Sequence, residues 1–359
     1  MSLKKSQVIH HFIIEIWYYR NNRRYKKGHD GKELTMKKIR WGIIGCGNVT
    51  EVKSGPGFQN ADNSELVAVM RRDGALAKDY AKRHNVPKWY DDATALIEDP
   101  DVDAVYIATP PAYHKDYTLQ CAKAGKPVYV EKPMALNFEE CNAMIQGCKQ
   151  EGVPLYVAYY RRGLPRFHKI KELIDTKAIG EVRFVTVNNT QPIIRPDGEG
   201  TLPWRVKPEL AGGGIFFDIG CHTLDILDYI LGPIKEVSGH ANNQGGTYPA
   251  EDIVSGTFVF ESGVHGSGVW CFSAFEREDM NVIVGSKGKI EFSTFGNEPI
   301  RVTTAHDIQT YEIINPTHIQ QPLIQMIVDD LSGVATAPST GVSASRTSWV
   351  MDEMVKGYR

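Results

Sequence analysis

Two short stretches of this sequence combine residue types that could move a proton. The tripeptide Glu131-Lys132-Pro133 directly follows an apolar run, and Asp218 and His222 follow a run of glycines. A lysine ammonium can stabilise negative charge that develops on an alcohol oxygen, and an imidazole can exchange a proton near neutral pH. Each residue also has an ordinary structural interpretation: Lys132 as a solvated lysine in a turn, Asp218 as a helix cap, and His222 as a core or surface histidine.

The spacing of the second stretch bears on both interpretations. Asp218 and His222 are four positions apart, so on an α-helix they would lie one turn apart on the same face. Asp225 and Asp228 continue the segment and raise the alternative of a divalent cation. No further ligand follows at a suitable spacing, and we therefore predict no metal site.

A different chemistry, the binding of a dinucleotide, is indicated near the start of the chain. The stretch Gly45-Cys46-Gly47-Asn48-Val49 directly follows the apolar run 38–44. Glycines after a strand allow a tight turn and a close approach of the backbone to a pyrophosphate, which rests on the amino terminus of the next helix. Thr50 takes the place of the third glycine in the G-x-G-x-x-G pattern, so an ordinary turn remains the alternative.

Two arginines bear on which dinucleotide would bind. Arg71 and Arg72 follow a second apolar run, 65–70. An NAD-selective fold places an acid at this point to accept the ribose hydroxyl groups. A guanidinium can instead pair with a 2′-phosphate and stack on adenine. We therefore favour NADP(H) as the cofactor over NAD(H); the alternative is a pair of solvated surface arginines.

These residues need a scaffold, and the spacing of the apolar runs predicts one. From residue 38 to 159, short apolar strands alternate with helical patterns, which predicts βαβ units and a doubly wound parallel sheet of the Rossmann type. The predicted strands are 38–44, 65–70, 103–108, 127–130 and 154–159, and the predicted helices are 74–85, 91–99, 114–124 and 137–150. Such sheets bind ligands at the carboxyl ends of their strands, which is where Lys132 and the glycine turn fall.

Beyond residue 160 the pattern changes to strands separated by turns rich in Gly and Asn. It predicts an α+β domain with a large, mainly antiparallel open sheet built of consecutive hairpins. The predicted strands are 180–189, 234–241, 253–260, 264–271, 280–284, 289–293, 300–304 and 308–314, and the predicted helices are 165–175, 222–231, 319–331 and 343–358. We expect a dinucleotide-binding domain at 36–159 and a substrate-binding and dimerisation domain at 160–359, whose last helix could pack back on the first domain.

Composition excludes several classes of protein. The chain has 359 residues, of which 42% are hydrophobic and 23% charged, and its net charge of −2 does not indicate a nucleic-acid partner. No apolar run approaches the roughly 20 residues that a membrane-spanning helix needs. The six cysteines form no C-x-x-C pair and no zinc pattern, which indicates a reduced, cytoplasmic protein.

The first 35 residues differ from the rest of the chain. They hold eight Lys and Arg against three Asp and Glu, a net charge of +5, so the remainder carries −7 of the total of −2. Their apolar residues precede the basic cluster, which is the reverse of the order in a signal peptide. We expect residues 1–35 to be a poorly ordered extension, with a surface-lying amphipathic anchor as the alternative.

The order of these motifs resembles the glucose–fructose oxidoreductase/inositol dehydrogenase/MocA (Gfo/Idh/MocA) family of oxidoreductases, over about residues 38–358. The matching segments are Gly45-Cys46-Gly47-Asn48, Ala108-Thr109-Pro110-Pro111 with His114, Ala124-Gly125-Lys126-Pro127, Glu131-Lys132-Pro133, Tyr160-Arg161-Arg162, Trp204-Arg205, and Gly212-Gly213-Gly214 with Asp218-Ile219-Gly220-Cys221-His222. The resemblance implies a Rossmann domain, a second domain whose open sheet mediates dimer contacts, and oxidation or reduction of sugars, polyols or related cyclic alcohols with NAD or NADP.

The resemblance also implies roles for individual residues. Lys132, Asp218 and His222 would be catalytic, with Lys132 at the substrate oxygen and the cofactor, and with His222 as an acid/base that Asp218 orients or tunes. Cofactor contacts would come from the glycine turn, Arg71, Arg72, Thr109, Pro110, His114, Glu131 and Lys132. Substrate contacts would come from Tyr160, Arg162, Trp204, Arg205, Asp218 and His222.

Two other functions fit parts of the same pattern. A dinucleotide-binding sensor or assembly protein would keep the fold without catalysis, but we would expect it to lose members of the Lys132, Asp218 and His222 set. A glycosidase that uses NAD for transient oxidation would keep the acid that Arg71 replaces. We therefore favour an NAD(P)-dependent dehydrogenase or reductase of a small carbohydrate-like molecule, assembled as a homodimer or homotetramer through its open sheet.

Overall fold

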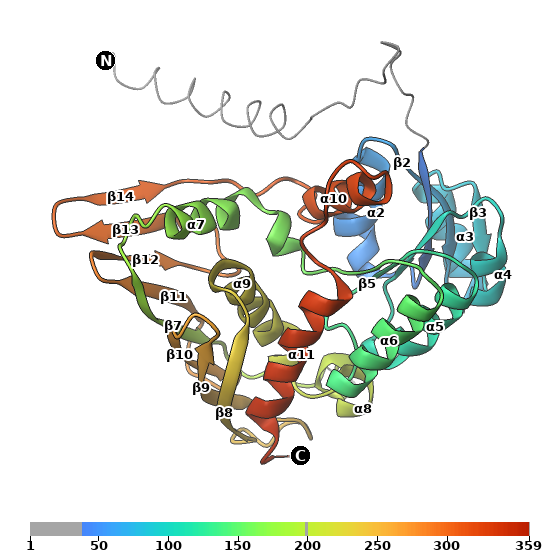
Figure 1. Ribbon diagram of the computed structural model, residues 1–359. Coiled ribbons are helices and arrows are strands. Elements are labelled where there is room, and N and C mark those ends of the chain that lie inside the picture. Colours follow the sequence, from blue (N-terminus) through green and yellow to red (C-terminus); the bar gives the residue numbers. More distant parts are fainter. Residues whose placement is uncertain (1–37, 198–199, 359) are drawn as a thin grey trace, which may run out of the picture.

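Six parallel strands form the first sheet of the computed structural model, which describes residues 38–197 and 200–358 (Figure 1). The strand order is β3-β2-β1-β4-β5-β6, so the predicted doubly wound parallel sheet is confirmed. The strands are β1 (Ile39–Ile44), β2 (Ser64–Met70), β3 (Lys88–Tyr90), β4 (Ala104–Ile107), β5 (Val128–Val130) and β6 (Leu155–Val157). Strand β3 was not predicted, because three partly exposed residues at a sheet edge leave no apolar run. The predicted extension, 1–35, lies outside the described residues.

The helices of this half begin where short polar side chains cap them. Asp73, Asp92 and Asn137 accept hydrogen bonds from backbone N–H groups two or three residues further on, which satisfies donors that have no partner inside the helix. The helices are η1 (Thr50–Ser54), a π-helix, α2 (Gly55–Asn60), α3 (Gly74–Arg83), α4 (Ala93–Glu98), η2 (Pro111–Tyr113), α5 (His114–Lys123) and α6 (Phe138–Gln150). They return the chain to the start of each strand, so the loops after β1, β2, β4 and β5 meet at one edge.

Eight strands form the second sheet, in the order β14-β13-β12-β11-β7-β10-β9-β8. The strands are β7 (Val182–Thr190), β8 (Ile234–Asn242), β9 (Ile253–Phe260), β10 (His265–Cys271), β11 (Glu278–Gly285), β12 (Gly288–Phe292), β13 (Ile300–Thr304) and β14 (Ile308–Tyr311). The large, mainly antiparallel sheet is confirmed, and consecutive hairpins form β8–β10 and β11–β14, but the predicted hairpin between β10 and β11 is wrong. Strand β7 lies between β10 and β11, parallel to the first and antiparallel to the second, so the chain crosses β7 between those strands.

One face of the second sheet carries a layer of helices (Figure 1). The helices of this half are η3 (Tyr160–Gly163), α7 (Pro165–Asp175), η4 (Trp204–Val206), α8 (Pro208–Ala211), η5 (Phe216–Gly220), α9 (Cys221–Leu231), α10 (Gln321–Leu331) and α11 (Gly341–Val355). The helical run from Pro208 to Leu231 has the length and the hydropathy of a membrane span, but 78% of its most apolar window is buried inside the protein. It is therefore accounted for as the core of this half.

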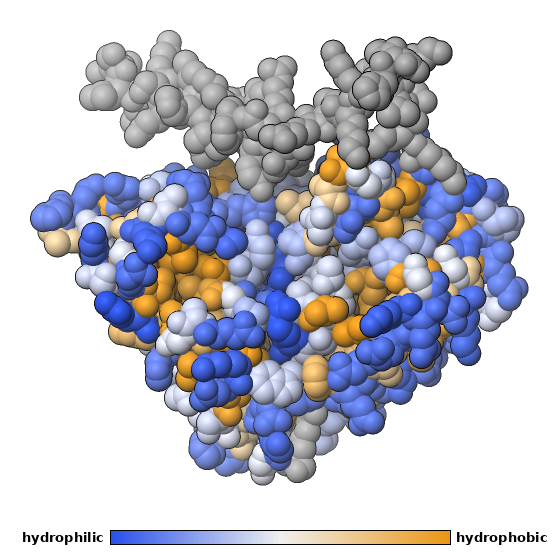
Figure 2. All heavy atoms as spheres, viewed as in Figure 1, coloured by the Kyte–Doolittle hydropathy of each residue, from blue (hydrophilic) through white to orange (hydrophobic). Residues whose placement is uncertain are grey.

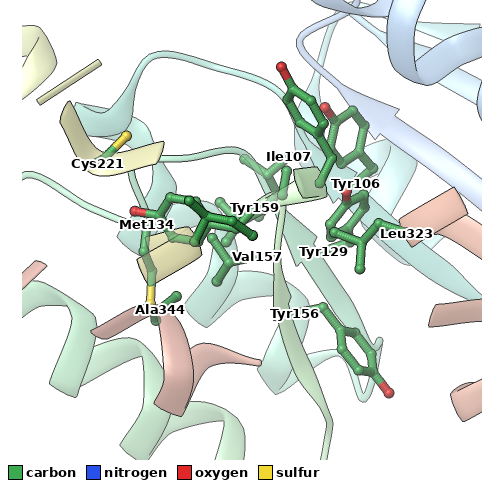
Figure 3. Close-up of a cluster of buried hydrophobic side chains, with 14 of the residues drawn as sticks. Tyr106, Ile107, Tyr129, Met134, Tyr156, Val157, Tyr159, Cys221, Leu323 and Ala344 are labelled. Carbon is green, nitrogen blue, oxygen red and sulfur yellow. The ribbon is translucent and has the colours of Figure 1, made fainter. Parts of the chain in front are cut away.

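Two C-terminal helices pack against both halves. α11 contacts α6 of the first half as well as α9 and β8 of the second, and α10 contacts α2 and η3. The Cys141 thiol donates to Ser348 at 3.3 Å, and the Phe138 backbone N–H donates to Asp352 at 2.7 Å. Figure 3 shows Tyr106 and Tyr129 of the first sheet beside Leu323 of α10, and Met134, from the segment after β5, beside Ala344 of α11.

The other face of the second sheet is open. On β10, Gly266, Gly268 and Trp270 are buried while Ser267 and Val269 between them are exposed, which is the alternation of a sheet covered on one side only. Phe184, Val269 and Met280 are 42%, 39% and 39% exposed. In the view of Figure 1, which takes in both halves, apolar residues occur in separate patches among hydrophilic ones (Figure 2).

The open face predicts that two copies of the chain pair through it, because an uncovered apolar sheet face in a folded protein usually meets a partner. Replacing Val269, at the centre of this face, by Glu should convert a dimer at micromolar concentration into a monomer. Sedimentation velocity measures this. Gln309→Glu on the edge strand β14 is the matched control and should remain associated. A parent protein that sediments as a monomer would overturn the assignment.

Candidate functional site

Lys132 lies just past the carboxyl end of β5 and reaches into the second half of the molecule. Its Nζ donates to carboxylate Oδ1 of Asp218 at 2.6 Å and to the backbone carbonyl of Asp218 at 2.9 Å. The two side chains are only 13% and 15% exposed. Burial opposes the charge on Lys132, but the attraction of Asp218 outweighs it and raises the pKa of the lysine. The ammonium form is therefore retained in a largely buried position.

Asp218 is shared between two cations. Its Oδ2 pairs with Nε of Arg205 at 3.0 Å, and the guanidinium of Arg205 lies 4.6 Å from the centre of the Trp204 ring. Burial by itself would raise the pKa of Asp218, but Lys132 and Arg205 together lower it. An ionised carboxylate thus joins the Glu-Lys-Pro turn to η4, the short helix that carries Trp204 and Arg205.

Asp218 does not hydrogen-bond to His222, although the family resemblance implied that it would orient or tune the imidazole. Asp218 lies in η5, which is a π-helix, and His222 lies at the start of α9. A π-helical turn holds more residues than an α-helical one, so the spacing does not bring the two side chains together. Both oxygens of Asp218 are engaged by Lys132 and Arg205, and no hydrogen bond joins Asp218 to His222 in the described part of the chain. This part of the prediction is wrong.

Aromatic rings surround His222 instead. The rings of Tyr159, Tyr160 and Phe295 lie 6.2, 5.4 and 5.7 Å from the imidazole, each presented edge to face. His222 is 4% exposed, and its Nδ1 is buried without a hydrogen-bond partner among the residues that the structure describes. A buried polar atom that lacks a partner is costly. It is the first sign that this pocket is completed by something other than the chain.

The charge state of His222 follows from the same surroundings. Burial lowers the pKa of His222 well below its usual value, and the positive charges of Arg161, Lys132 and Lys53 lower it further. The ring is therefore neutral at physiological pH.

Glu131 holds the Glu-Lys-Pro turn in place through three hydrogen bonds. Its Oε1 accepts from the Tyr106 hydroxyl at 2.5 Å and from the Gln320 amide at 2.8 Å, and its Oε2 accepts from the backbone N–H of Lys132 at 3.1 Å. Glu131 is 7% exposed. The carboxylate therefore holds the backbone of Lys132 in place through β4 and the start of α10.

His114 also fixes the turn, which corrects the prediction that it lines the cofactor. It is fully buried, with Nε2 2.7 Å from the carbonyl oxygen of Thr109 and Nδ1 3.1 Å and 3.2 Å from those of Pro133 and Met134. The ring thus ties the end of β4 to the Glu-Lys-Pro turn. Burial lowers the pKa of His114.

Arg162 does not face a substrate, contrary to the prediction. Its guanidinium is 4% exposed and makes ion pairs with Asp225 at 2.7 Å and with Asp228 at 3.0 Å, and Arg346 of α11 also binds Asp228 at 2.6 Å. These aspartates are therefore engaged in a buried charge network. Within residues 38–197 and 200–358, no group of three or more His, Cys, Asp or Glu side chains is arranged as a metal site.

The glycine turn after β1 comes very close to the end of β4. Gly45 has a φ of +94°, and a Cβ on it would come within 3.0 Å of the Ala108 carbonyl and of the Thr109 side chain. At Gly47, in contrast, a Cβ would meet only the Gly45 carbonyl oxygen, at 3.9 Å. Thr50 is fully buried and donates from Oγ1 to the Gly47 carbonyl at 2.7 Å. The Thr50 side chain therefore lies on the buried side of the turn. Although Thr50 stands at the position of the third glycine, it does not block the solvent side of the turn.

The other predicted cofactor residues lie along the same edge. Arg71 directly follows β2, and its Nη1 is 3.5 Å from the Cys46 carbonyl oxygen; Arg72 lies 5.3 Å from the centre of the Tyr113 ring. Thr109 has a buried Oγ1 without a partner among the described residues. The uncrowded Gly47 and this unpartnered hydroxyl fit a bound dinucleotide, which residues 45–49, Arg71, Thr109, Pro110 and Lys132 would hold.

Three residues of the site were missed by reasoning from the sequence. Arg161 and Phe295 contact the rings around His222, and Gln320 holds Glu131. Arg161 stands in the Tyr160-Arg161-Arg162 motif, but the motif does not show which arginine points inwards to the aspartates. Phe295 and Gln320 lie far along the chain in segments without a recognisable motif, so only the fold reveals them.

Known protein families match this chain along most of its length. Residues 39–159 match the GFO_IDH_MocA model, described as an oxidoreductase family with an NAD-binding Rossmann fold, and residues 167–291 match the model of the GFO/IDH/MocA C-terminal domain. Oxidoreductase P35 of Formosa agariphila is 40% identical over 320 residues, 88% of this chain and 98% of that protein.

More distant relatives extend the comparison. The trans-1,2-dihydrobenzene-1,2-diol dehydrogenase of Mus musculus is 30% identical over 255 residues, 70% of this chain and 73% of that protein. Among solved structures, levoglucosan dehydrogenase in complex with NADH and levoglucosan superposes with a TM-score of 0.79 at 23% identity, over 89% of this chain and 97% of that one. At that identity the likeness shows the fold alone.

The neutral His222 predicts a loss of stability on acidification. Because the folded-state pKa lies below the usual histidine value of about 6.5, protonation favours the unfolded chain, and stability is lost as the pH falls through this window. The loss for one site is at most about 1.4 kcal/mol per pH unit. Replacing His222 by Asn should remove this contribution, which urea unfolding of both proteins between about pH 7.5 and 5.5 measures. His306→Asn, at an exposed position, should keep the parental slope; equal slopes for all three proteins would refute the assignment.

Proposed function

This chain belongs to the Gfo/Idh/MocA family and is an NAD(P)-dependent oxidoreductase acting on CH–OH groups, and we propose that it transfers a hydride between NADP(H) and a secondary alcohol or carbonyl of a sugar, polyol or related cyclic alcohol. Lys132 and His222 assist the proton transfer, and Asp218 positions Lys132. The observation that carries the proposal is the buried Lys132–Asp218 pair beside a neutral His222.

The residue chemistry supports these roles. The nicotinamide cofactor, when bound, accepts or supplies the hydride. Oxidation of an alcohol then leaves a hydroxyl proton to be removed as negative charge develops on the oxygen. The Lys132 ammonium, held charged by Asp218, stabilises that oxygen. The neutral His222 accepts the proton, and in the reverse reaction it returns it.

The position of the pair supports a role at the reacting carbon. Lys132 follows β5 at the ligand edge of the first sheet, and Asp218 and His222 come from helices of the second half. A ligand between the halves would meet the cofactor residues on one side and Trp204, Arg205 and Tyr160 on the other. We assign substrate contacts to these three residues and to Asp218 and His222.

Substitution of the two proton-handling residues tests this mechanism. Lys132→Ala and His222→Ala should each lower kcat on the order of 100- to 10,000-fold, while dinucleotide binding persists. The assay is absorbance of the reduced nicotinamide band during a screen of sugars, polyols and cyclic diols with both cofactors. Lys115→Ala on α5, which removes a lysine paired with Glu140 away from the site, is the control. Parental turnover in both active-site variants would disprove the roles.

We propose NADP(H) as the preferred cofactor because of the residues at the end of β2. Arg71 stands where an NAD-selective fold carries an acid, and the next acid, Asp73, accepts hydrogen bonds from the N–H groups of Ala75 and Leu76 as the cap of α3. Arg72 lies over the Tyr113 ring, which leaves Arg71 the closer of the two to the glycine turn.

Titration with the two dinucleotides tests this preference. The parent should bind NADP⁺ more tightly than NAD⁺, and Arg71→Ala should weaken NADP⁺ binding on the order of 10- to 100-fold with little effect on NAD⁺. Calorimetry or nicotinamide fluorescence measures both affinities. Lys82→Ala, which removes an exposed cation near the other end of α3, should change neither. If the parent bound NAD⁺ as tightly as NADP⁺, or more tightly, the role proposed for Arg71 would be contradicted.

We further propose that the chain is divided functionally at residues 159–160, with α11 bridging the two domains, and that it works in the cytoplasm. The matched family segments, 39–159 and 167–291, support the division. All six cysteines are unpaired and five are buried, which supports a reducing compartment. Fractionation of cells that express the full chain tests the location; recovery with membranes would count against it.

A further inference from the structure

Two guanidinium groups flank the proposed catalytic residues and leave their terminal nitrogens without protein acceptors. Arg205 lies beside Asp218 and binds it through Nε, with a side chain that is 48% exposed. Arg161 lies beside His222 and donates through Nε to the carbonyl oxygen of Thr294 at 2.9 Å. In the described part of the chain, these are the hydrogen-bonded or ion-paired contacts that either guanidinium makes.

Arg161 is the more unusual of the two because it is buried. It is 4% exposed, its Nη1 is buried without a partner among the described residues, and no ion pair is formed with a described carboxylate. The guanidinium lies 4.4 Å from the centre of the Phe295 ring and 4.8 Å from that of Tyr160. Aromatic faces attract a cation, but they do not replace the hydrogen-bond acceptors and the counter-charge that a buried guanidinium needs.

Two neighbouring arginines, Arg162 and Arg166, show how this fold supplies a buried guanidinium with hydrogen-bond acceptors. Arg162 is paired with Asp225 and Asp228. Arg166, 2% exposed, lacks a partner only at Nε. Its Nη1 and Nη2 donate to the backbone carbonyls of Gly296 and Glu298. Arg161 alone of these three has its terminal nitrogens unmatched, and it alone shares Tyr160 and Phe295 with His222.

The charges that act on His222 are also positive. Lys132, Arg161 and Lys53 all act on His222 as positive charges. The nearby carboxylates already have other partners: Asp218 is divided between Lys132 and Arg205, Glu131 accepts from Tyr106, Gln320 and the Lys132 backbone, and Asp279 accepts from the backbone N–H groups of Thr294 and Phe295. A pocket with this excess of cations and with unused guanidinium donors favours a ligand that brings its own negative charge.

We propose that the substrate carries an oxyanion substituent, a carboxylate or a phosphate or sulfate ester, that pairs with Arg161 while the reacting hydroxyl lies between Lys132 and His222. Arg205, at the exposed end of the site, adds positive charge that draws the anion in. The inference rests on the proposed hydride transfer and narrows its substrate from sugars and polyols in general to their acidic derivatives.

Matched sugars that differ only at one carbon test the inference. We would measure kcat/KM with D-glucose, D-glucuronate, D-glucose 6-phosphate and D-glucose 6-sulfate, and with the corresponding galactose series, using the full chain and both cofactors. At least one anionic sugar should exceed its neutral parent by about tenfold or more. The anionic sugar with the highest kcat/KM identifies which oxyanion is recognised.

Variants then locate the recognition. Arg161→Met should abolish the preference, lowering the ratio of kcat/KM for the anionic sugar to that for its neutral parent by about tenfold or more, whatever its effect on the turnover of both sugars. Arg166→Met removes an equally buried arginine from α7 and should affect both sugars alike, through stability. A preference for the neutral sugars, or an Arg161→Met variant that lowers both sugars equally, would overturn the inference.

Binding separates this inference from the proposed reaction. Calorimetry of the enzyme with saturating NADP⁺ should show each preferred anionic sugar binding at least about tenfold more tightly than its neutral parent, and Arg161→Met should remove the difference. That result without turnover would support anion recognition and count against hydride transfer. The absence of an anion preference in both assays would overturn the inference and leave the proposed reaction standing.

Discussion

The ion pair between Lys132 and Asp218 is the contact on which the site depends. It joins a turn after β5 of one sheet to a helical segment of the other half, in surroundings that leave each side chain about one-seventh exposed. Breaking one partner would leave a largely buried charge, which is far more costly than losing a surface pair. The supporting contacts act on the same two residues: Glu131 holds the backbone of Lys132, and Arg205 takes the second oxygen of Asp218.

Burial keeps His222 neutral, and the pair does not oppose this effect. A carboxylate next to an imidazole would stabilise its protonated form, but Asp218 is engaged by two cations, Lys132 and Arg205. His222 is left with aromatic neighbours and with the positive charges of Arg161, Lys132 and Lys53. Lysine and histidine are thus held in opposite charge states within one pocket, which is what separate roles in stabilising an oxygen and accepting its proton require.

The sequence was sufficient for those features that depend on local pattern. Apolar runs at βαβ spacing predicted the first sheet, and Lys132 could be placed at its ligand edge because a parallel strand ends there. Features that depend on helix type or on which neighbour fills a space could not be read in this way. The four-residue interval between Asp218 and His222 has its usual meaning only on an α-helix, and η5 is a π-helix. Likewise, Arg161 and Arg162 are equivalent in sequence, and only the position of Asp225 makes one structural and leaves the other beside His222.

The helix α11 gives this architecture a further property. It packs on α6 in one half and on α9 and β8 in the other, and its Ser348 and Asp352 form hydrogen bonds to the first half. It therefore acts as a brace across the two domains, and α10 makes a second crossing through Gln320. A hinge motion would have to break these contacts together with the Lys132–Asp218 pair. Contacts at three separate places, on α11, at Gln320 and at the Lys132–Asp218 pair, therefore oppose a rotation of one domain relative to the other.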